Sequence, residues 1–80
     1  MGFYHFTTVD GFGRYGLGIV DLSEIAAVKS MTYYADGDSG GREGAIIFLR
    51  GGGEIGVQST PSTVAQILRE EWLKNEVADY

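Results

Sequence analysis

The sequence predicts a small α+β domain, in which an antiparallel sheet of four to five strands carries one C-terminal amphipathic helix on one face. Three observations indicate this fold. Aromatic and β-branched runs dominate the first part of the chain, glycines 51–53 separate two apolar runs, and a Thr-Pro pair at 60–61 precedes apolar residues at helical spacing. Since no repeat or linker interrupts the pattern, we expect one compact domain over residues 1–75 and a frayed tail over 76–80.

Three extended segments are expected in the first half of the chain. Residues 3–9 form an aromatic and β-branched strand, and residues 17–21 form the second strand after a glycine-broken stretch. Leu22 and Ile25 then bound a short turn and are expected to point into the core. The extended pattern resumes over residues 26–34.

A polar loop and an apolar strand are predicted next. Residues 35–44 contain four glycines, four charged residues and no large apolar side chain, which predicts an exposed loop. Residues 45–49 are apolar at both alternating positions, which predicts a strand that is buried on both sides or covered by a second subunit. We expect the subunit interface to be either the face of the sheet away from the helix or this strand, with Ile47 in the interface in the second case.

A tight hairpin and the helix complete the predicted fold. Gly51–Gly53 supply the positive φ angles that a tight turn needs, and residues 54–58 alternate with Ile55 and Val57 inward. Thr60 is a suitable helix cap because its hydroxyl accepts hydrogen bonds from free N–H groups, and the proline after it suits the first helical turn. The helix is expected to reach about residue 75 and to pack one apolar stripe on the sheet: Val64, Ile67, Leu68 and Trp72.

Composition and charge exclude several functional classes. The chain has 80 residues, no cysteine and one histidine, which excludes disulfides, a thiol nucleophile and the structural zinc sites built on Cys and His. Six basic residues against eleven acidic ones give a net charge of −5, which argues against binding the phosphate backbone of a nucleic acid. No apolar run approaches the length of a membrane span and the N-terminus lacks the pattern of a secretion signal, so we expect a cytoplasmic location.

The size of the chain predicts self-association. On folding, a chain of this length buries roughly 62% of the surface that it exposes when extended, which is marginal for a stable domain. Disulfides and structural zinc cannot compensate here, so copies of the chain are expected to share a core as a homo-oligomer.

Two motifs that suggest an enzyme or a metal site are better explained as parts of a loop. Residues 37–41, Gly-Asp-Ser-Gly-Gly, match the string around the nucleophile of trypsin-like proteases, but those enzymes need a histidine base and a far longer scaffold. Asp36, Asp38 and Glu43 lack the spacing of a calcium-binding loop. We interpret all of them as residues of a solvated loop.

The remaining titratable residues provide no catalytic set. His5 is interpreted as a half-buried packing residue of the first strand, and Glu70 and Glu71 project in different directions from the helix. We therefore predict a protein that is not an enzyme, with no catalytic residue, no bound metal and no cofactor.

The glycine-rich segment at residues 11–16 is the candidate ligand site. Its sequence, Gly-Phe-Gly-Arg-Tyr-Gly, satisfies the dinucleotide-binding string, but a strand follows it where a Rossmann fold needs a helix, so that fold is rejected. Successive glycines still allow backbone N–H groups to converge on an anion, although the alternative that they only make turns stays open. The candidate ligand-binding residues come from this segment and from two arginines beside other glycine loops: Gly11, Gly13, Arg14, Tyr15, Gly16, Arg42 and Arg50.

Three stretches of the chain resemble the small flagellar FlbD-like family. Residues 19–28, 45–57 and 62–68 are similar to that family in their order of a strand, a glycine-turn hairpin and a short helix. The resemblance implies a short, non-enzymatic protein.

Two functional hypotheses follow. In the first, a non-catalytic homo-oligomer binds an anionic, nucleotide-like small molecule in a pocket between subunits and sequesters it. In the second, an acidic surface with aromatic residues binds or blocks another protein, as in a phage-encoded anti-defence inhibitor or a flagellar accessory protein. Neither hypothesis involves a nucleic acid or a membrane.

Overall fold

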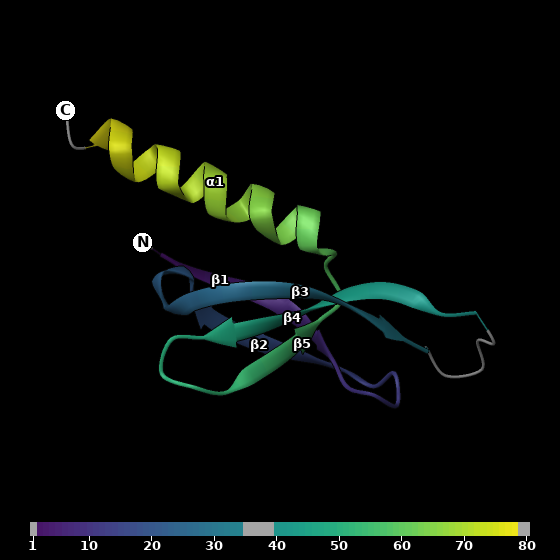
Figure 1. Ribbon diagram of the computed structural model, residues 1–80. Coiled ribbons are helices and arrows are strands. Elements are labelled where there is room, and N and C mark those ends of the chain that lie inside the picture. Colours follow the sequence, from purple (N-terminus) through teal and green to yellow (C-terminus); the bar gives the residue numbers. More distant parts are fainter. Residues whose placement is uncertain (1, 35–39, 79–80) are drawn as a thin grey trace.

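Five strands, a 3₁₀ turn and one helix make up the part of the chain that the computed structural model describes, residues 2–34 and 40–78, with the backbone alone from residue 74 onward. In chain order they are β1 (Phe3–Val9), β2 (Tyr15–Asp21), η1 (Leu22–Glu24), β3 (Ile25–Tyr33), β4 (Arg42–Leu49), β5 (Glu54–Val57) and α1 (Pro61–Ala78) (Figure 1). The elements confirm the predicted α+β class.

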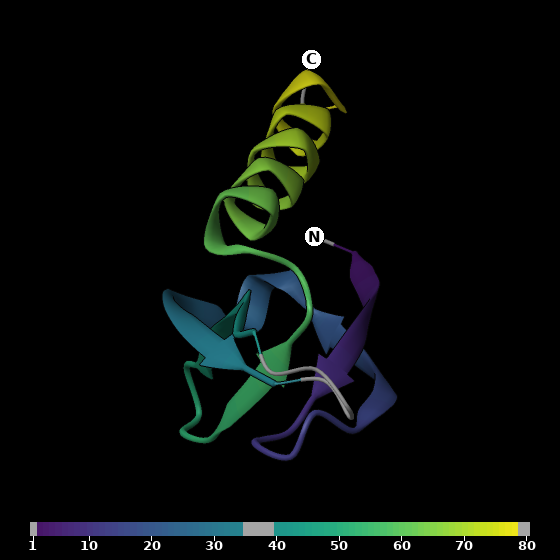
Figure 2. The ribbon, with the colours of Figure 1, turned by 90° about the vertical axis from the view of Figure 1, so that its right-hand side faces the viewer.

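The sheet is antiparallel and has the strand order β2-β1-β5-β4-β3, so β2 and β3 are its edges. It is strongly coiled, as twisted strands require. Tyr15 at the start of β2 and Tyr33 at the end of β3 belong to opposite edges, yet their ring centroids lie 6.3 Å apart. Figure 2 shows the coiled sheet on one side of α1.

The core lies between the sheet and α1. One cluster of buried side chains contains residues from all five strands, η1 and α1. Leu22 and Ile25 belong to it, as predicted for the turn between β2 and β3. Its most deeply buried members are Phe6, Ala45, Ile47, Val57 and Val64.

The prediction that Ile47 lies in a subunit interface is wrong. Ala45 and Ile47 are completely buried within a single copy of the chain, because their side of β4 belongs to the cluster that Val64 of α1 covers. Ile46 and Phe48, which alternate with them, are half-buried. The apolar run therefore belongs to a strand of the chain's own core.

Two predicted local signals are confirmed in detail. Thr63 N–H donates a hydrogen bond to Thr60 Oγ1 over 3.3 Å, so Thr60 caps α1. In the β4–β5 turn, Gly52 and Gly53 have φ angles of +93° and +91°, which favour glycine, whereas Gly51, for which the same was predicted, does not. The N–H of Leu49 closes this turn on the carbonyl of Gly53 at 3.1 Å.

The apolar stripe of α1 packs on the sheet along only part of its length. Val64 is buried, and Ile67 and Leu68 are partly buried against the core, as predicted. Trp72, which was expected to pack beside them, is 56% exposed. The reason is that α1 diverges from the sheet toward its C-terminal end (Figure 1).

Three element boundaries differ from the prediction by more than one residue. β2 begins earlier, at Tyr15, because its ladder with β1 continues to the pair with Val9. β4 begins at Arg42, inside the predicted loop, because that residue pairs with Tyr33, while residues 35–39 of the loop lie outside the described residues. The predicted tail is helical as far as Ala78, since no glycine or proline ends α1 near residue 75.

The molecule is elongated, with extents of 50 × 22 × 19 Å. The helix and the β3–β4 hairpin extend from the core in opposite directions (Figure 1). This shape leaves the C-terminal turns of α1 without a strand beneath them.

Candidate functional site

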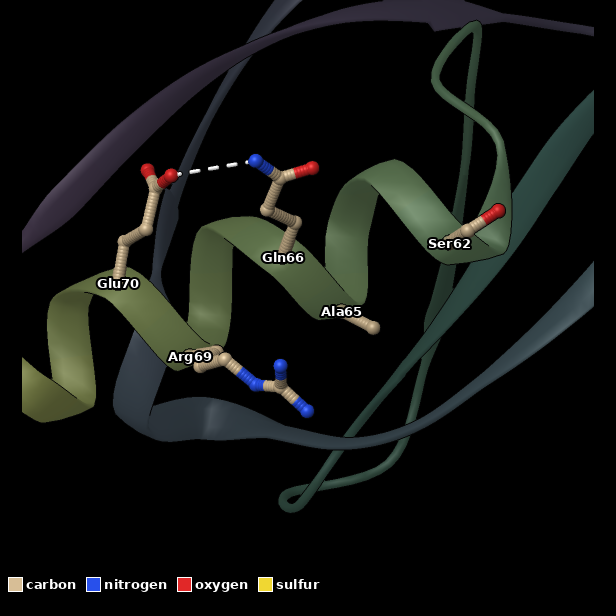
Figure 3. A pocket seen from close by; sticks show the side chains of 5 residues that line it. All are labelled: Ser62, Ala65, Gln66, Arg69 and Glu70. Atoms are coloured by element: carbon tan, nitrogen blue, oxygen red, sulfur yellow. Dashed lines mark hydrogen bonds between the residues drawn. The ribbon is translucent and has the colours of Figure 1, made fainter.

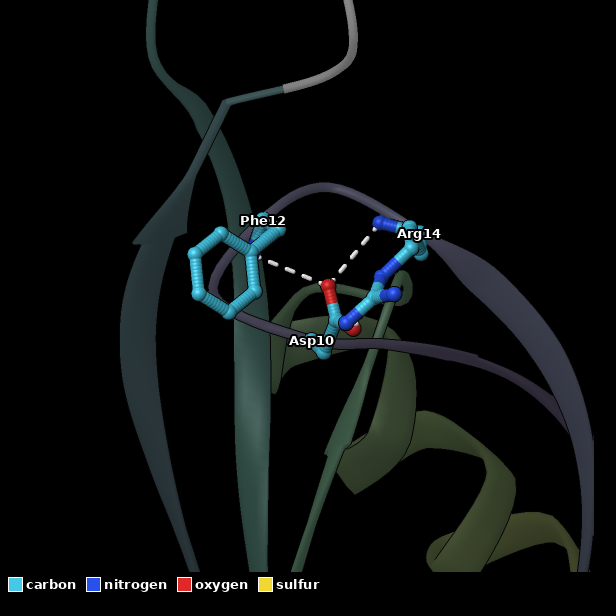
Figure 4. Close-up of polar contacts among 3 residues, drawn as sticks. All are labelled: Asp10, Phe12 and Arg14. Carbon is cyan, nitrogen blue, oxygen red and sulfur yellow. Dashed lines mark hydrogen bonds and ion pairs between the residues drawn. The ribbon is translucent and has the colours of Figure 1, made fainter.

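The β1–β2 turn is built around the carboxylate of Asp10. Its Oδ1 accepts hydrogen bonds from the backbone N–H groups of Phe12 at 2.9 Å and Arg14 at 3.0 Å, and its Oδ2 lies 3.0 Å from Arg14 Nε (Figure 4). The Arg14 guanidinium also lies 5.3 Å from the centroid of the Phe12 ring. Gly13 has a φ angle of +78°, which allows the chain to fold back onto Asp10.

These donors lower the pKa of Asp10. The backbone hydrogen bond from Arg14 is the largest cause, desolvation opposes it, and the bonds from Phe12 and from the Arg14 side chain add to it. The backbone N–H groups were predicted to bind the anion of a ligand. They already donate to a carboxylate of the same chain. A ligand at residues 11–16 would have to displace the Asp10 carboxylate or bind beside it.

A shallow hollow of about 380 Å³ lies beside Arg14. Three predicted site residues, Arg14, Tyr15 and Gly16, line it together with Asp10 and Glu54. Two carboxylates and one guanidinium thus border the same space, and this balance of charge does not favour an anionic ligand. The other predicted glycines, at 11 and 13, are residues of the turn itself.

Tyr15 links this turn to Arg42. The Tyr15 ring meets the ring of the buried Tyr33 edge-on, and Arg42 is the ladder partner of Tyr33. Burial is the main cause that raises the pKa of Tyr33, and a hydrogen bond with Tyr15 raises it further, while Gln58 and the charge of Arg42 lower it. The structure therefore brings Arg14, Tyr15 and Arg42 to one end of the sheet.

Arg50 lies at the other end of β4, apart from the other predicted site residues. Its backbone N–H donates to the carbonyl of Glu24 at 2.8 Å, and its Nε donates to the carbonyl of Ser23 at 3.0 Å. Within one copy of the chain, Arg50 therefore belongs to a different surface.

That surface is a shallow, open groove of about 590 Å³ between α1 and η1. Its apolar floor includes Leu22 and Leu68, and Arg50, Arg69 and Trp72 lie at its rim. The groove combines two guanidinium groups with apolar surface, which is the mixture found at protein-binding surfaces.

A second hollow, of about 400 Å³, continues along α1 and shares Ala65 and Arg69 with the groove. Figure 3 shows Ala65 and Arg69 projecting to one side of the helix and Gln66 and Glu70 to another. Gln66 Nε2 donates a hydrogen bond to Glu70 Oε1 at 3.3 Å. Glu70 and Arg69 therefore border this second hollow from different sides of α1.

Exposed apolar side chains gather on the outer face of the β1–β2 hairpin. The ladder pairs His5 with Ile19 and Thr7 with Leu17, so these side chains and that of Phe3 share the face turned away from the core. Phe3 is 71% exposed, Leu17 is 70% exposed and Ile19 is 60% exposed. We call Phe3, Leu17 and Ile19 the hairpin face.

The hairpin face was not predicted from the sequence, although β2 carries a signal for it. Leu17 and Ile19 alternate with Gly16 and Gly18, and it is the glycines that face inward. A Cβ on Gly18 would lie 2.8 Å from Thr8 Cγ2, and one on Gly16 would lie 2.9 Å from Thr8 Oγ1, so these two inward positions have no room for a side chain. The large apolar residues of this strand must therefore point outward.

The described residues contain no group of three or more His, Cys, Asp or Glu side chains placed to hold a metal ion. His5, predicted to be half-buried, is exposed beside the hairpin face. Among the same residues, no helix is long and apolar enough to cross a membrane.

Comparison of the chain with protein-family models, with curated proteins and with solved structures finds no match. The resemblance to the FlbD-like family therefore stays a prediction.

Proposed function

We propose that this chain is a non-catalytic protein-interaction module whose copies associate through the hairpin face. The observation that carries the proposal is the exposure of Phe3, Leu17 and Ile19 side by side on an edge hairpin. Single exposed apolar residues are ordinary, but a contiguous apolar patch marks a surface that another molecule covers. The proposal joins the self-association expected from the length of the chain to the second functional hypothesis.

The size of the patch fits a second copy of the chain. Phe12 at the tip of the same hairpin is also exposed, at 78%. Together, these four side chains expose roughly 500 Å². A standard interface buries roughly 800 Å² on each partner, and a symmetric dimer uses the same patch of both copies, with polar neighbours such as His5 and Thr7 forming the rim.

The surface of the whole chain also supports a partner. A single copy exposes 5338 Å², which is roughly 600 Å² more than the surface that folded monomers of this mass expose on average. Its radius of gyration is 13.6 Å, against about 11.6 Å for a compact domain of this length. A chain with this much uncovered surface gains stability when a second copy covers the apolar part of it.

An anionic, nucleotide-like ligand at Arg14 has less support. Asp10 already accepts hydrogen bonds from the donors of the turn, and Glu54 adds a second negative charge to the hollow. We expect a panel of nucleotides and cyclic dinucleotides to leave the melting temperature unchanged. A rise that Arg14→Ala abolishes would favour the small-ligand hypothesis instead.

The test of the proposal compares two surface variants by light scattering. Leu17→Ser/Ile19→Ser removes most of the hairpin face, and Leu73→Ser is the matched control because Leu73 is an exposed apolar residue on α1. The wild type and Leu73→Ser are expected to show the mass of an oligomer, and the hairpin variant that of a monomer. Since the changed side chains are exposed within one copy, circular dichroism should show that each variant folds.

Either of two results would contradict the proposal. One is a hairpin variant that keeps the mass of the wild type. The other is a wild type that is itself a monomer at the concentrations where the variants are compared.

A further inference from the structure

We propose that the groove between α1 and η1 is a second binding site, which accepts an acidic segment with apolar side chains from another protein. Its floor includes Leu22, Ile25 and Leu68, and its rim includes Arg50, Arg69 and Trp72. The groove shares no described residue with the hairpin face, so this inference goes beyond the proposed function and can fail or hold independently of it.

Arg50 is held at the rim by the 3₁₀ turn. Its Nε donates to the carbonyl of Ser23 at 3.0 Å, and its backbone N–H donates to the carbonyl of Glu24 at 2.8 Å. Within the described part of the chain the guanidinium donates through Nε alone, so its other donors remain for a partner. A cationic group that is already fixed loses little conformational entropy when a carboxylate binds.

Arg69 and Trp72 face this site from neighbouring turns of α1. Figure 3 shows Arg69 projecting on the side of Ala65, away from Gln66 and Glu70. Among the residues that the structure describes, Arg69 makes no hydrogen bond or ion pair, and Trp72 is 56% exposed. Tryptophan and arginine are the residue types that contribute most to protein interfaces when a partner covers them.

The charge of the groove identifies the chemistry of the partner. The chain has a net charge of −5, yet two of its six basic residues lie at this rim, and none of the described lining residues is acidic. A locally positive surface on an acidic protein selects an acidic partner and steers it to this place. The apolar floor adds a requirement for apolar side chains on the same segment.

The shape of the groove favours a peptide over a small molecule. It is continuous with the hollow that Ser62, Gln66 and Glu70 line further along α1. Small-molecule sites enclose most of their ligand, whereas an elongated surface beside a helix accepts an extended or helical segment. A peptide of about three helical turns would span both hollows, with its acidic residues over the groove and its uncharged residues beside Glu70.

The test uses three labelled amphipathic peptides that share the same Leu and Phe positions and carry Glu, Gln or Lys at the others. Trp72 is the one tryptophan of the chain and therefore reports on the groove directly. We expect the Glu peptide to bind the full chain and to change the Trp72 emission, and the Gln and Lys peptides to bind at least about tenfold more weakly.

Matched variants locate the binding. Arg50→Gln/Arg69→Gln is expected to weaken the Glu peptide about tenfold, while Arg14→Gln, an arginine-to-glutamine change at the far end of the sheet, leaves the affinity unchanged. The hairpin variant Leu17→Ser/Ile19→Ser should also keep full affinity, which separates this site from self-association. The proposal would be overturned if all three peptides bound equally, if Arg14→Gln weakened the Glu peptide as much as the double variant does, or if the Glu peptide did not bind. It would also be overturned if the chain bound ADP in preference to the Glu peptide.

Discussion

Asp10 determines what the β1–β2 turn presents to solvent. The glycine string that follows it predicts that backbone donors converge on an anion, and they do converge, on a carboxylate of the same chain. The sequence shows which groups can donate. Which acceptor reaches them depends on how Gly13 folds the chain back, and composition does not reveal this.

The lowered pKa values of Asp10 and Asp21 predict a loss of stability in acid. For Asp10 the main cause is the backbone N–H of Arg14, and for Asp21 it is the hydroxyl of Ser23. A folded-state pKa below the unfolded value, about 3.9, means that each carboxylate stabilises the fold above that pH and loses this effect as pH falls through the folded pKa. We expect Asp10→Asn/Asp21→Asn to flatten the decline of the urea midpoint below about pH 4. An NMR titration that places both carboxyl pKa values at or above 3.9 would contradict this account.

Close packing around Gly56 predicts that replacing this glycine destabilises the fold. A Cβ there would lie 2.6 Å from the carbonyl oxygen of Val9, whereas a Cβ on Gly51 would meet no atom within 4 Å. Gly56→Ala should lower the free energy of unfolding by about 1–3 kcal/mol. Gly51→Ala should leave it unchanged or raise it by up to about 1 kcal/mol. Urea denaturation of the two variants measures both effects, and equal stabilities would show that the approach to Val9 is not tight.

At the scale of elements, local signals predicted well where strands, turns and caps lie in the chain. They predicted poorly which face of an element is covered by the rest of the chain. The residues of β1, the β4–β5 turn and the Thr60 cap follow from short-range chemistry, and the structure has them where the sequence places them. Which face of a strand is covered depends on distant elements. For that reason Ile47, assigned to an interface, lies in the core, and Trp72, assigned to the core, is exposed.

Substitutions of two isoleucines on different strands distinguish the contribution of the core to stability from that of the hairpin face. Ile47 is completely buried in β4, so Ile47→Ala should lower the free energy of unfolding by about 2–5 kcal/mol at every protein concentration. Ile19 is 60% exposed in β2, so Ile19→Ala should matter only where copies associate, with an effect that grows with concentration. Urea denaturation at a low and a high concentration tests this contrast. A concentration-independent loss for Ile19→Ala would mean that Ile19 packs within its own chain.

At the scale of the molecule, strand order was the part that the sequence could not predict. β5 pairs with the N-terminal strand β1, far from it in the sequence, and this contact brings the two hairpins into one sheet. The same arrangement divides the predicted site residues, with Arg14, Tyr15 and Arg42 at one end and Arg50 beside α1. The sequence alone shows neither the strand order nor this separation of the predicted site residues.

Three features of this chain support self-association through an uncovered apolar face: its small size, its large exposed surface and the hairpin face. Sedimentation velocity of the wild type between about 1 and 100 µM measures it most directly. We predict a sedimentation coefficient that rises with concentration toward that of an oligomer and stays at the monomer value in Leu17→Ser/Ile19→Ser. A wild type that sediments as one monomeric species over the whole range would contradict the account.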